Sequence, residues 1–366
     1  MTLEDFFSEW NNDSDRVLVH TSGSTGKPKP MMVEKKRMLN SARITCDFLG
    51  LKPGDSALLC MSLEYIAGKM VVVRSIERHL HLISVSPSGH PLKNIDLKDV
   101  NGKDVNGKDV NGKDVNGEIT FAAMVPMQVY NTLQVPEERE RLTHIRHLII
   151  GGGAIDASLE KELQALPGNI AIWSTYGMTE TLSHIALRRI NGAEASEWYQ
   201  PFDSVKISLT EEGCLVIDAP LVCSETLVTN DIVEIESYIY NKVEKNEVME
   251  KLRFRIKGRK DNVICSGGIK IQIEEVEALL KPHLEKPFML AKKKDEKFGE
   301  IAVLLTEDED LKKVEATIRR LLSGKSDDPN KSSESKGHKY WIPREFRYVE
   351  HLPLTETGKP KRCCLA

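Results

Sequence analysis

The chain has 366 residues, of which 40% are hydrophobic and 29% are charged, and its formal net charge at pH 7 is −4. This length and composition predict a globular protein of two domains with a well-buried core, and the near balance of charge argues against a nucleic-acid-binding protein. No apolar run reaches the roughly 18 residues of a membrane span, and the first ten residues lack the basic start and apolar core of a secretion signal, so we expect a cytoplasmic protein.

The first half of the chain alternates short apolar runs with longer segments of helical spacing. We expect strands at 17–20, 57–61, 81–85, 119–125, 147–150 and 171–176. Helices are expected at 35–49, where Gly50 ends the helix, and at 65–79. Strand–helix alternation of this kind predicts an α/β sheet.

A loop rich in glycine, hydroxyl and lysine residues follows the first of these strands. It reads Thr21-Ser22-Gly23-Ser24-Thr25-Gly26-Lys27-Pro28-Lys29-Pro30. Backbone N–H groups, hydroxyls and ammonium groups of this kind can close around phosphate oxygens. Gly23 and Gly26 are three positions apart rather than five, which excludes a Walker A loop and disfavours a P-loop NTPase fold. Taken alone, the segment fits a solvated turn equally well.

Residues 98–117 are four tandem copies of Lys-Asp-Val-Asn-Gly. An Asn-Gly pair every five residues favours serial tight turns, and one valine per copy cannot build a core. We expect a surface hairpin without chemistry, because lengthening such a loop costs little free energy.

Two further loops follow predicted strands. Gly151-Gly152-Gly153-Ala154 comes after the strand at 147–150, and Tyr176-Gly177-Met178-Thr179-Glu180-Thr181 ends the strand at 171–176. Ligands of open α/β sheets bind at the carboxyl ends of strands, so the two loops can share one site. The alternatives are a structural glycine turn for the first loop and a helix start capped by Thr179 for the second.

The second half of the chain changes character. Strands at 205–209, 214–217 and 231–235, separated by Glu-Gly and Thr-Asn turns, predict an antiparallel segment. From Asp261 the pattern restarts with a strand at 263–265, a turn at 266–268, and helices from 274 and at 311–322. We therefore predict a mixed α/β and α+β protein, with a large domain at 1–260 and a small mobile domain at 261–366.

Several motifs, taken in order, resemble the acyl-adenylate-forming superfamily of acyl-CoA synthetases, peptide-synthetase adenylation domains and luciferases. They are the loops at 21–30, 151–154 and 176–181, then Thr229-Asn230-Asp231, the segment 258–268, and Pro353-Leu354-Thr355-Glu356-Thr357-Gly358-Lys359. The resemblance extends over residues 16–362. Pro30 departs from it, because the family usually has glycine at that position, and proline stiffens the exit of the loop.

The resemblance implies an ATP site. The residues that it places on the nucleotide are Thr21, Ser22, Gly23, Ser24, Thr25, Gly26, Lys27, Gly152, Gly153, Ala154, Tyr176, Gly177, Thr179, Thr181, Asp231 and Arg259. Within this set Tyr176 stacks on the adenine, Thr179 or Thr181 contacts phosphate, and the Asp231 carboxylate accepts from the ribose hydroxyls. Glu180 is implied as the Mg²⁺ ligand, since that cation prefers oxygen donors.

The resemblance also implies that the small domain moves, with Asp261 as its hinge. Lys359 then swings in to bridge the acyl carboxylate and the α-phosphate, and it is implied as a catalytic residue together with Lys27 and Glu180. The residues implied for the coenzyme A tunnel are Gly267, Gly268 and Lys270.

The segment 61–75 resembles the o-succinylbenzoate:CoA ligases of menaquinone biosynthesis. Gly68 and Arg74-Ser75 match that family, whereas Tyr65 stands where a histidine is usual. The residues expected around the acyl substrate are Tyr65, Gly68, Arg74, Ser183 and Arg188. Arg74, Ser183 and Arg188 are the candidates for the distal succinyl carboxylate, because a second anion inside an acyl pocket needs a charge-assisted partner.

The resemblance therefore implies a ligase that acts on o-succinylbenzoate through an acyl-adenylate, with Mg²⁺ as its cofactor and with ATP, coenzyme A and a small-molecule carboxylate as its partners. Two alternatives are another aryl- or acyl-CoA ligase and an adenylating enzyme that loads a carrier protein. A third, a nucleotide-binding module without turnover, is suggested by Pro30 and Tyr65. Retention of Glu180, Asp231, Arg259 and Lys359 argues against that third alternative.

Overall fold

The structure, a computed structural model, describes residues 1–20, 30–95, 118–242, 247–323 and 338–354, with no account of the side chains at 240–249. Its internal contacts divide the chain into two compact units. The first unit comprises Met1–Ser208, Val216–Leu227 and Ile235–Arg255, and the second comprises Leu209–Leu215, Val228–Glu234 and Ile256–Ala366.

A seven-stranded sheet forms the centre of the first unit, in the order β4-β3-β5-β6-β7-β8-β9. Its strands are β3 (Ser56–Leu59), β4 (His81–Ser84), β5 (Ile119–Met124), β6 (Ile145–Ile150), β7 (Ala171–Gly177), β8 (His184–Arg189) and β9 (Gln200–Pro201). The strands from β4 to β7 pair in parallel, and β8 and β9 pair antiparallel. All six residues of β5 are buried, as expected for a parallel strand covered on both faces.

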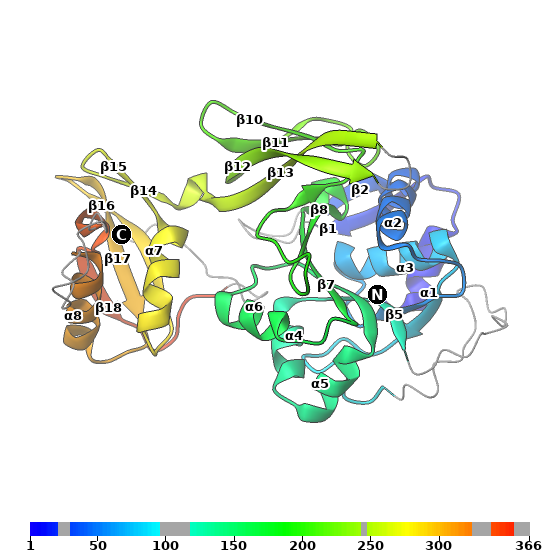
Figure 1. Cartoon of the computed structure of the whole chain (residues 1–366), viewed down its shortest axis with the longest axis horizontal. Coiled ribbons are helices and arrows are strands. Elements are labelled where there is room, and N and C mark those ends of the chain that lie inside the picture. Colours follow the sequence, from blue (N-terminus) through cyan, green and yellow to red (C-terminus); the bar gives the residue numbers. More distant parts are fainter. Residues whose placement is uncertain (21–29, 96–117, 243–246, 324–337, 355–366) are drawn as a thin grey trace. The chain divides into compact units, whose positions relative to one another are not determined.

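Helices cover this sheet. They are α1 (Leu3–Trp10), α2 (Lys35–Leu49), α3 (Ile66–Arg78), α4 (Pro126–Leu133), α5 (Pro136–Thr143) and α6 (Ala157–Gln164). Figure 1 shows α4, α5 and α6 grouped beside the sheet, apart from the packed pair α2 and α3. Buried side chains of α4, α5 and α6 form one apolar core with β3, β5, β6 and β7.

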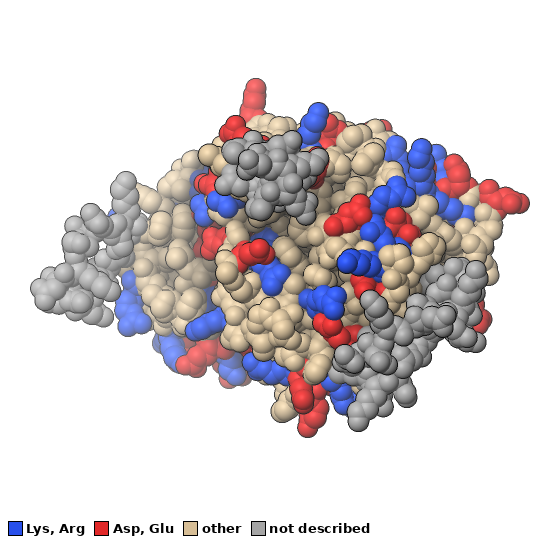
Figure 2. Space-filling view, turned by 45° about the vertical axis from the view of Figure 1, so that its right-hand side comes forward, with Lys and Arg blue, Asp and Glu red and all other residues tan. Residues whose placement is uncertain are grey.

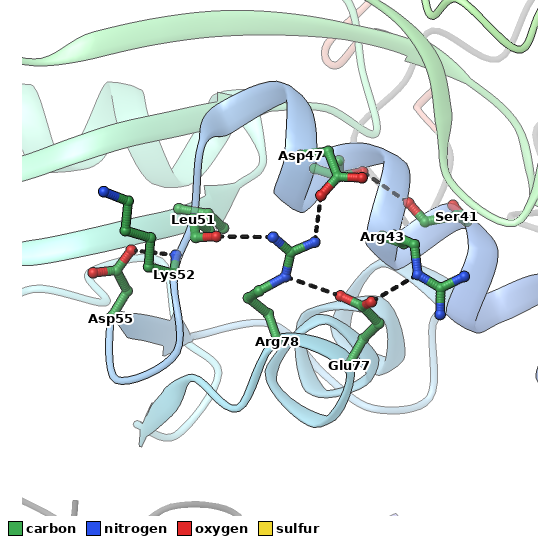
Figure 3. A network of polar contacts seen from close by, with 9 residues as sticks. Ser41, Arg43, Asp47, Leu51, Lys52, Asp55, Glu77 and Arg78 are labelled. Carbon is green, nitrogen blue, oxygen red and sulfur yellow. Dashed lines mark hydrogen bonds and ion pairs between the residues drawn. The ribbon is translucent and has the colours of Figure 1, made fainter.

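The helices α2 and α3 are joined by a polar network on their surface (Figure 3). Arg78 of α3 donates to the Leu51 carbonyl at 3.0 Å and to the Asp47 carboxylate at 2.5 Å. Glu77 pairs with both Arg78, at 3.3 Å, and Arg43 of α2, at 3.0 Å. These contacts keep the two helices in a fixed register, and each helix supplies one buried polar side chain, Thr45 or Arg74, to the same cluster.

A two-stranded antiparallel sheet, β1 (Arg16–His20) and β2 (Pro30–Glu34), brings both ends of the glycine-rich loop together. His20 pairs with Pro30 at the last position of the register. The loop residues 21–29 lie outside the described residues, as do the repeat at 98–117 and the segment 324–337.

A four-stranded sheet follows in the order β10-β11-β12-β13. Its strands are β10 (Lys206–Leu209), β11 (Cys214–Asp218), β12 (Leu227–Lys242) and β13 (Glu247–Arg259). The expected turn at Thr229-Asn230 is wrong, because both residues lie inside β12. With β11 and β13 as neighbours on either side, the backbone of β12 stays extended through the polar pair, and the β-branched Val228 and Thr229 favour that conformation.

The C-terminal part of the second unit is a five-stranded sheet with two helices. Its elements are β14 (Val263–Ser266), β15 (Ile269–Gln272), α7 (Ile273–Leu280), β16 (Phe288–Asp295), β17 (Gly299–Thr306), α8 (Leu311–Leu322) and β18 (Glu345–Tyr348). The strand order is β15-β14-β17-β16, and β18 pairs in parallel with β17. Buried side chains of α7 and α8 form one core with this sheet, which is an α+β arrangement.

The mixed α/β and α+β class predicted from the sequence is therefore confirmed. Among the described residues, no helix combines the length and the apolar character needed to cross a membrane. Figure 2 shows Lys and Arg interspersed with Asp and Glu over the face in view, without an extended area of one sign.

Candidate functional site

The loops after β5, β6 and β7 meet at the carboxyl ends of these strands. Gly151 donates its N–H to the carbonyl of Met124, the last residue of β5, at 3.1 Å. A Cβ on Gly151 would collide with the Thr175 hydroxyl of β7, so a larger residue here would force that hydroxyl to move. Gly152 has a φ of +77°, in the region that favours glycine. Gly153 and Ala154, which follow it, are exposed.

The loop after β7 is held by its own hydrogen bonds. The Thr181 hydroxyl donates to the Ser183 carbonyl at 2.7 Å and accepts from the Met178 N–H at 3.0 Å. Thr179 and Thr181 are buried, whereas Glu180 between them is exposed on the short 3₁₀ helix η1 (Thr179–Thr181). The loop therefore presents the Glu180 carboxylate to solvent.

The ring of Tyr176 is fixed by two aromatic neighbours. It lies edge-on to Phe254 at 5.0 Å and to Tyr199 at 5.9 Å between ring centroids. Tyr199 is itself held by a 2.7 Å hydrogen bond between its hydroxyl and that of Ser174. Next to Tyr176, a Cβ on Gly177 would collide with the Ser183 carbonyl oxygen, so this turn also requires glycine.

Arg74 of α3 is a buried cation with neutral partners. Its side chain donates from Nη2 to the Ser183 hydroxyl at 2.6 Å and to the Thr45 hydroxyl at 3.4 Å, and its guanidinium lies 5.8 Å from the ring centroid of Phe121. Nε has no hydrogen-bond partner, and in the described part of the chain no carboxylate contributes to the electrostatic environment of this residue. Burial lowers the pKa of Arg74 to about 10, which leaves the group charged at neutral pH.

His184 completes this cluster behind the arginine. Its Nδ1 lies 3.1 Å from the Ser183 hydroxyl and its Nε2 lies 3.0 Å from the Thr45 hydroxyl. Sequence reasoning missed both His184 and Thr45, because one polar residue on an otherwise apolar face is most often part of the core. The structure shows that they form a second layer around Arg74 and Ser183.

Arg188, the other arginine predicted for the acyl substrate, has a different environment. Its guanidinium forms two 2.7 Å hydrogen bonds with the Glu160 carboxylate and lies 5.5 Å from the ring centroid of Tyr199. The charge of Arg188 is thus balanced within the protein.

The predicted residues Tyr65 and Gly68 lie at the start of α3. Tyr65 precedes the helix as its N-cap residue and is exposed. A Cβ on Gly68 would collide with the Ser62 carbonyl oxygen, so the first turn of α3 packs directly on the preceding backbone.

In the second unit, Arg259 joins two predicted site carboxylates. Its Nη1 lies 3.1 Å from Asp231 Oδ1, and its Nη2 lies 2.7 Å from Asp261 Oδ2. The Asp261 carbonyl accepts a 2.8 Å hydrogen bond from the Lys292 ammonium. Asp231 and Arg259, 28 positions apart in the chain, are in this way held beside the predicted hinge at Asp261.

Gly267 and Gly268 form a turn with φ of +57° and +84°, and Lys270 is exposed on β15 directly after it. The Gly267 N–H donates to the Phe298 carbonyl at 2.9 Å. The Arg344 guanidinium lies 3.6 Å from the ring centroid of Phe298. The turn is therefore held by the backbone of Phe298, whose ring lies against Arg344.

The remaining predicted site residues lie outside the described residues. They are Thr21, Ser22, Gly23, Ser24, Thr25, Gly26 and Lys27 in the glycine-rich loop and Lys359 near the C-terminus. In the described part of the chain, no group of three or more His, Cys, Asp or Glu residues is arranged to hold a metal ion.

A family model described as AMP-binding enzyme matches residues 7–219, more than half of the chain. A 2-succinylbenzoate–CoA ligase from Haemophilus influenzae is 26% identical over 80% of this chain and 59% of its own length. One from Bacillus cereus is 22% identical over 94% of this chain and 68% of its own length. The chain thus spans about three fifths of the Haemophilus influenzae relative.

Solved structures show the same fold. An acyl-CoA synthetase (AMP-forming)/AMP-acid ligase II-like protein from Dyadobacter fermentans is 30% identical, with a TM-score of 0.59, over 98% of this chain and 90% of its own. The o-succinylbenzoate coenzyme A synthetase from Bacillus subtilis, in complex with ATP and magnesium ion, has a TM-score of 0.63 and 21% identity, over 94% of this chain and 68% of its own.

Proposed function

The chain belongs to the AMP-binding enzyme family, and we therefore propose that it is an AMP-forming ligase that joins a carboxylate to coenzyme A. In the first step a carboxylate oxygen of the substrate attacks the α-phosphorus of ATP, and pyrophosphate leaves. In the second step the thiol sulfur of coenzyme A attacks the acyl carbon, and AMP leaves. No protein nucleophile is needed, so the protein acts by orienting the reactants and stabilising charge.

The observation that carries the substrate assignment is the buried charge of Arg74. A buried cation without an anionic partner is costly, and a ligand carboxylate would remove much of that cost. Ser183, 2.6 Å from the guanidinium, adds a hydroxyl at the same place. We assign to this pair the carboxylate of the substrate that does not react, which in o-succinylbenzoate is the ring carboxylate rather than the succinyl carboxylate expected from the sequence. The substrate would then have two carboxylates, one that reacts and one that binds Arg74. o-Succinylbenzoate fits, because the similar ligases are named for it.

Arg188 has a smaller part in this proposal than Arg74. Since Glu160 already balances its charge, an anion would have to displace that carboxylate. We therefore place the second carboxylate on Arg74 and Ser183 and regard Arg188 as a support for Tyr199.

The nucleotide site is proposed at the loops after β6 and β7. Tyr176, held edge-on by Phe254 and Tyr199, would stack on the adenine, and Asp231 would accept from the ribose hydroxyls. Magnesium in phosphate sites takes one or two protein carboxylates and completes its shell with phosphate and water oxygens, which fits the single exposed carboxylate of Glu180. Bound there, the ion would neutralise phosphate charge.

The two half-reactions are proposed to use different orientations of the C-terminal domain. Lys359 would serve adenylate formation, and the Gly267-Gly268 turn with Lys270 would serve the coenzyme A step, with the pivot at Asp261. Arg259 lies beside that pivot, since it pairs with both Asp231 and Asp261.

Pyrophosphate release from ATP tests this function. The purified protein is incubated with o-succinylbenzoate, benzoate and a panel of aliphatic acids, with and without coenzyme A, and the products are identified by mass spectrometry. We expect AMP, pyrophosphate and o-succinylbenzoyl-CoA. Adenylate without a thioester would instead indicate an enzyme that loads a carrier protein, and ATP binding without pyrophosphate release would indicate a non-catalytic module.

A further inference from the structure

The side chains behind the proposed carboxylate site form a closed set of hydrogen bonds. Thr45 comes from α2, Arg74 from α3, His184 from the start of β8 and Ser183 from the position just before it, all within the first unit. Arg74, His184 and Thr45 are buried, and the His184 ring also contacts that of Phe202 at 5.6 Å between centroids. Only Ser183 is partly exposed.

The donors and acceptors of this set can pair in two ways, which differ only in the positions of the protons. The Thr45 hydroxyl donates its one proton to the Ser41 carbonyl at 3.1 Å, so it must accept from His184 Nε2–H. Nδ1 is then unprotonated and accepts, which means that the Ser183 hydroxyl donates to His184. In this first state, Ser183 has no proton left for a ligand.

The second state reverses the two bonds to the imidazole and breaks the bond from the Thr45 hydroxyl to the Ser41 carbonyl. If Thr45 donates to Nε2, the imidazole carries its proton on Nδ1 and donates to Ser183. The Ser183 oxygen can accept from both Nδ1–H and Arg74, which leaves its own O–H free to donate outward. The change needs no movement of heavy atoms, because only protons and hydroxyl rotors are rearranged.

A neutral imidazole is required for this exchange. Burial, and to a lesser extent the charge of Arg74, lower the pKa of His184 well below its ordinary value of 6.5. His184 thus carries a single ring proton at neutral pH. A charged ring would donate from both nitrogens and would add a second cation beside Arg74.

We propose that His184 is a positioning residue that determines specificity for a second carboxylate, because its tautomer decides whether the Ser183 hydroxyl donates to the protein or to the substrate. The proposal rests on the proposed function and extends it. A substrate with an anionic group at Arg74 selects the state with Nδ1–H, whereas a substrate without that group leaves the first state in place.

Two substitutions separate the two ring nitrogens. His184→Asn places an amide near the position of Nδ1 and can donate to Ser183, whereas His184→Gln reaches the position of Nε2 and keeps only the Thr45 contact. The readout is the ratio of kcat/KM for o-succinylbenzoate to that for 4-oxo-4-phenylbutanoate, which is the same molecule without the ring carboxylate. We expect His184→Asn to keep this ratio within about threefold of wild type. We expect His184→Gln to lower it by about tenfold, through KM, because the Ser183 oxygen then loses the donor that points its O–H at the substrate carboxylate. Equal ratios in wild type and His184→Gln would overturn the proposal.

A measurement on the wild-type protein avoids any dependence on how the variants fold. Nitrogen-15 NMR of the imidazole rings reports which nitrogen carries the proton, and the His184 signal is identified by its loss in His184→Gln or, if that variant does not fold, in His184→Asn. We expect the Nε2–H form in the free protein and in the complex with 4-oxo-4-phenylbutanoate, and the Nδ1–H form in the complex with o-succinylbenzoate. An unchanged tautomer in that last complex would contradict the proposal. If the wild-type protein activates no carboxylate at all, the proposed function itself is wrong, which is a different result from an active enzyme with an unchanged tautomer.

Discussion

Replacing Arg74 by methionine should stabilise or leave unchanged the free protein while it impairs the use of a substrate with two carboxylates. Burial lowers the pKa of Arg74 from its ordinary value to about 10. At about 1.4 kcal/mol per pKa unit, the buried charge costs on the order of 3 kcal/mol of folding free energy at neutral pH. The lost hydrogen bonds to Ser183 and Thr45 would offset about 1.5 to 3 kcal/mol of that gain.

We therefore expect the free energy of unfolding of Arg74→Met, measured by urea denaturation without ligand, to equal that of wild type or to exceed it by about 1 kcal/mol. The same helix offers a matched control in Lys69, a buried cation whose Nζ lies 3.6 Å from Glu9 Oε2 and 2.7 Å from the Leu18 carbonyl. Removing a paired cation leaves its partner uncompensated, so Lys69→Met should lower the free energy of unfolding by about 2 to 3 kcal/mol. This loss of unfolding free energy is smaller than for a fully buried ion pair, because the Glu9 side chain is 23% exposed.

Catalysis should respond in the opposite direction. Loss of a charge-assisted contact predicts a decrease of about ten- to a hundredfold in kcat/KM for o-succinylbenzoate, and less than about threefold for 4-oxo-4-phenylbutanoate. Pyrophosphate release under steady-state conditions measures both values. If Arg74→Met is destabilised as much as Lys69→Met, or if both substrates lose equally, Arg74 is a structural cation and the carboxylate site is wrong.

Three other predictions concern pH, thiol reactivity and the half-reactions. Because the pKa of buried His184 is lowered, the unfolded chain binds a proton near pH 6.5 that the folded chain does not. The free energy of unfolding is therefore expected to fall as the pH drops below that value. His184→Asn should show a shallower fall between pH 7 and 5, measured by urea titration at each pH. Burial raises the pKa of Cys46 to about 11 and that of Cys60 to about 12. Iodoacetamide at pH 8 should therefore label exposed Cys265 and leave these two unmodified, as checked by peptide mass mapping. Rapid labelling of either would contradict the packing of α2 or of the residue that follows β3. Lys359→Ala should slow adenylate formation by orders of magnitude yet leave thioester formation from preformed acyl-adenylate largely intact in single-turnover assays, and equal loss in both steps would argue against alternating domain orientations.

A helix with a clear boundary signal could be predicted from the sequence. Short helices with a weak apolar period were missed. The helix at 35–49 is confirmed, and Gly50 ends it with a φ of +66°, the conformation that glycine allows at such a position. The segments 126–133 and 136–143 also begin with proline at the first helical position, a usable signal, but each is only eight residues long and has a weak apolar period. The strands β12 and β13 extend beyond the predicted runs because pairing with neighbouring strands, rather than local preference, sets their length.

The candidate site could be predicted only in part. Sequence reasoning grouped Arg74, Ser183 and Arg188 for one anion, and the structure brings Arg74 and Ser183, 109 positions apart, to 2.6 Å. It gave no reason to separate Arg188 from them, because the partner of Arg188 is Glu160, on a helix that was not predicted. Thr45 and His184 carry no pattern of their own in the sequence, since their role depends on two helices and a strand that meet only in the folded chain.

An oxygen-18 transfer experiment tests the central claim most directly. The protein is incubated with ATP, coenzyme A and o-succinylbenzoate whose carboxylates are labelled with oxygen-18, and the AMP that forms is analysed by mass spectrometry. If the substrate carboxylate attacks the α-phosphorus, one carboxylate oxygen remains on the phosphate after the thiol displaces AMP, so the account predicts AMP with one heavy oxygen together with o-succinylbenzoyl-CoA. Unlabelled AMP, or a thioester formed with release of ADP instead of AMP, would contradict the acyl-adenylate route.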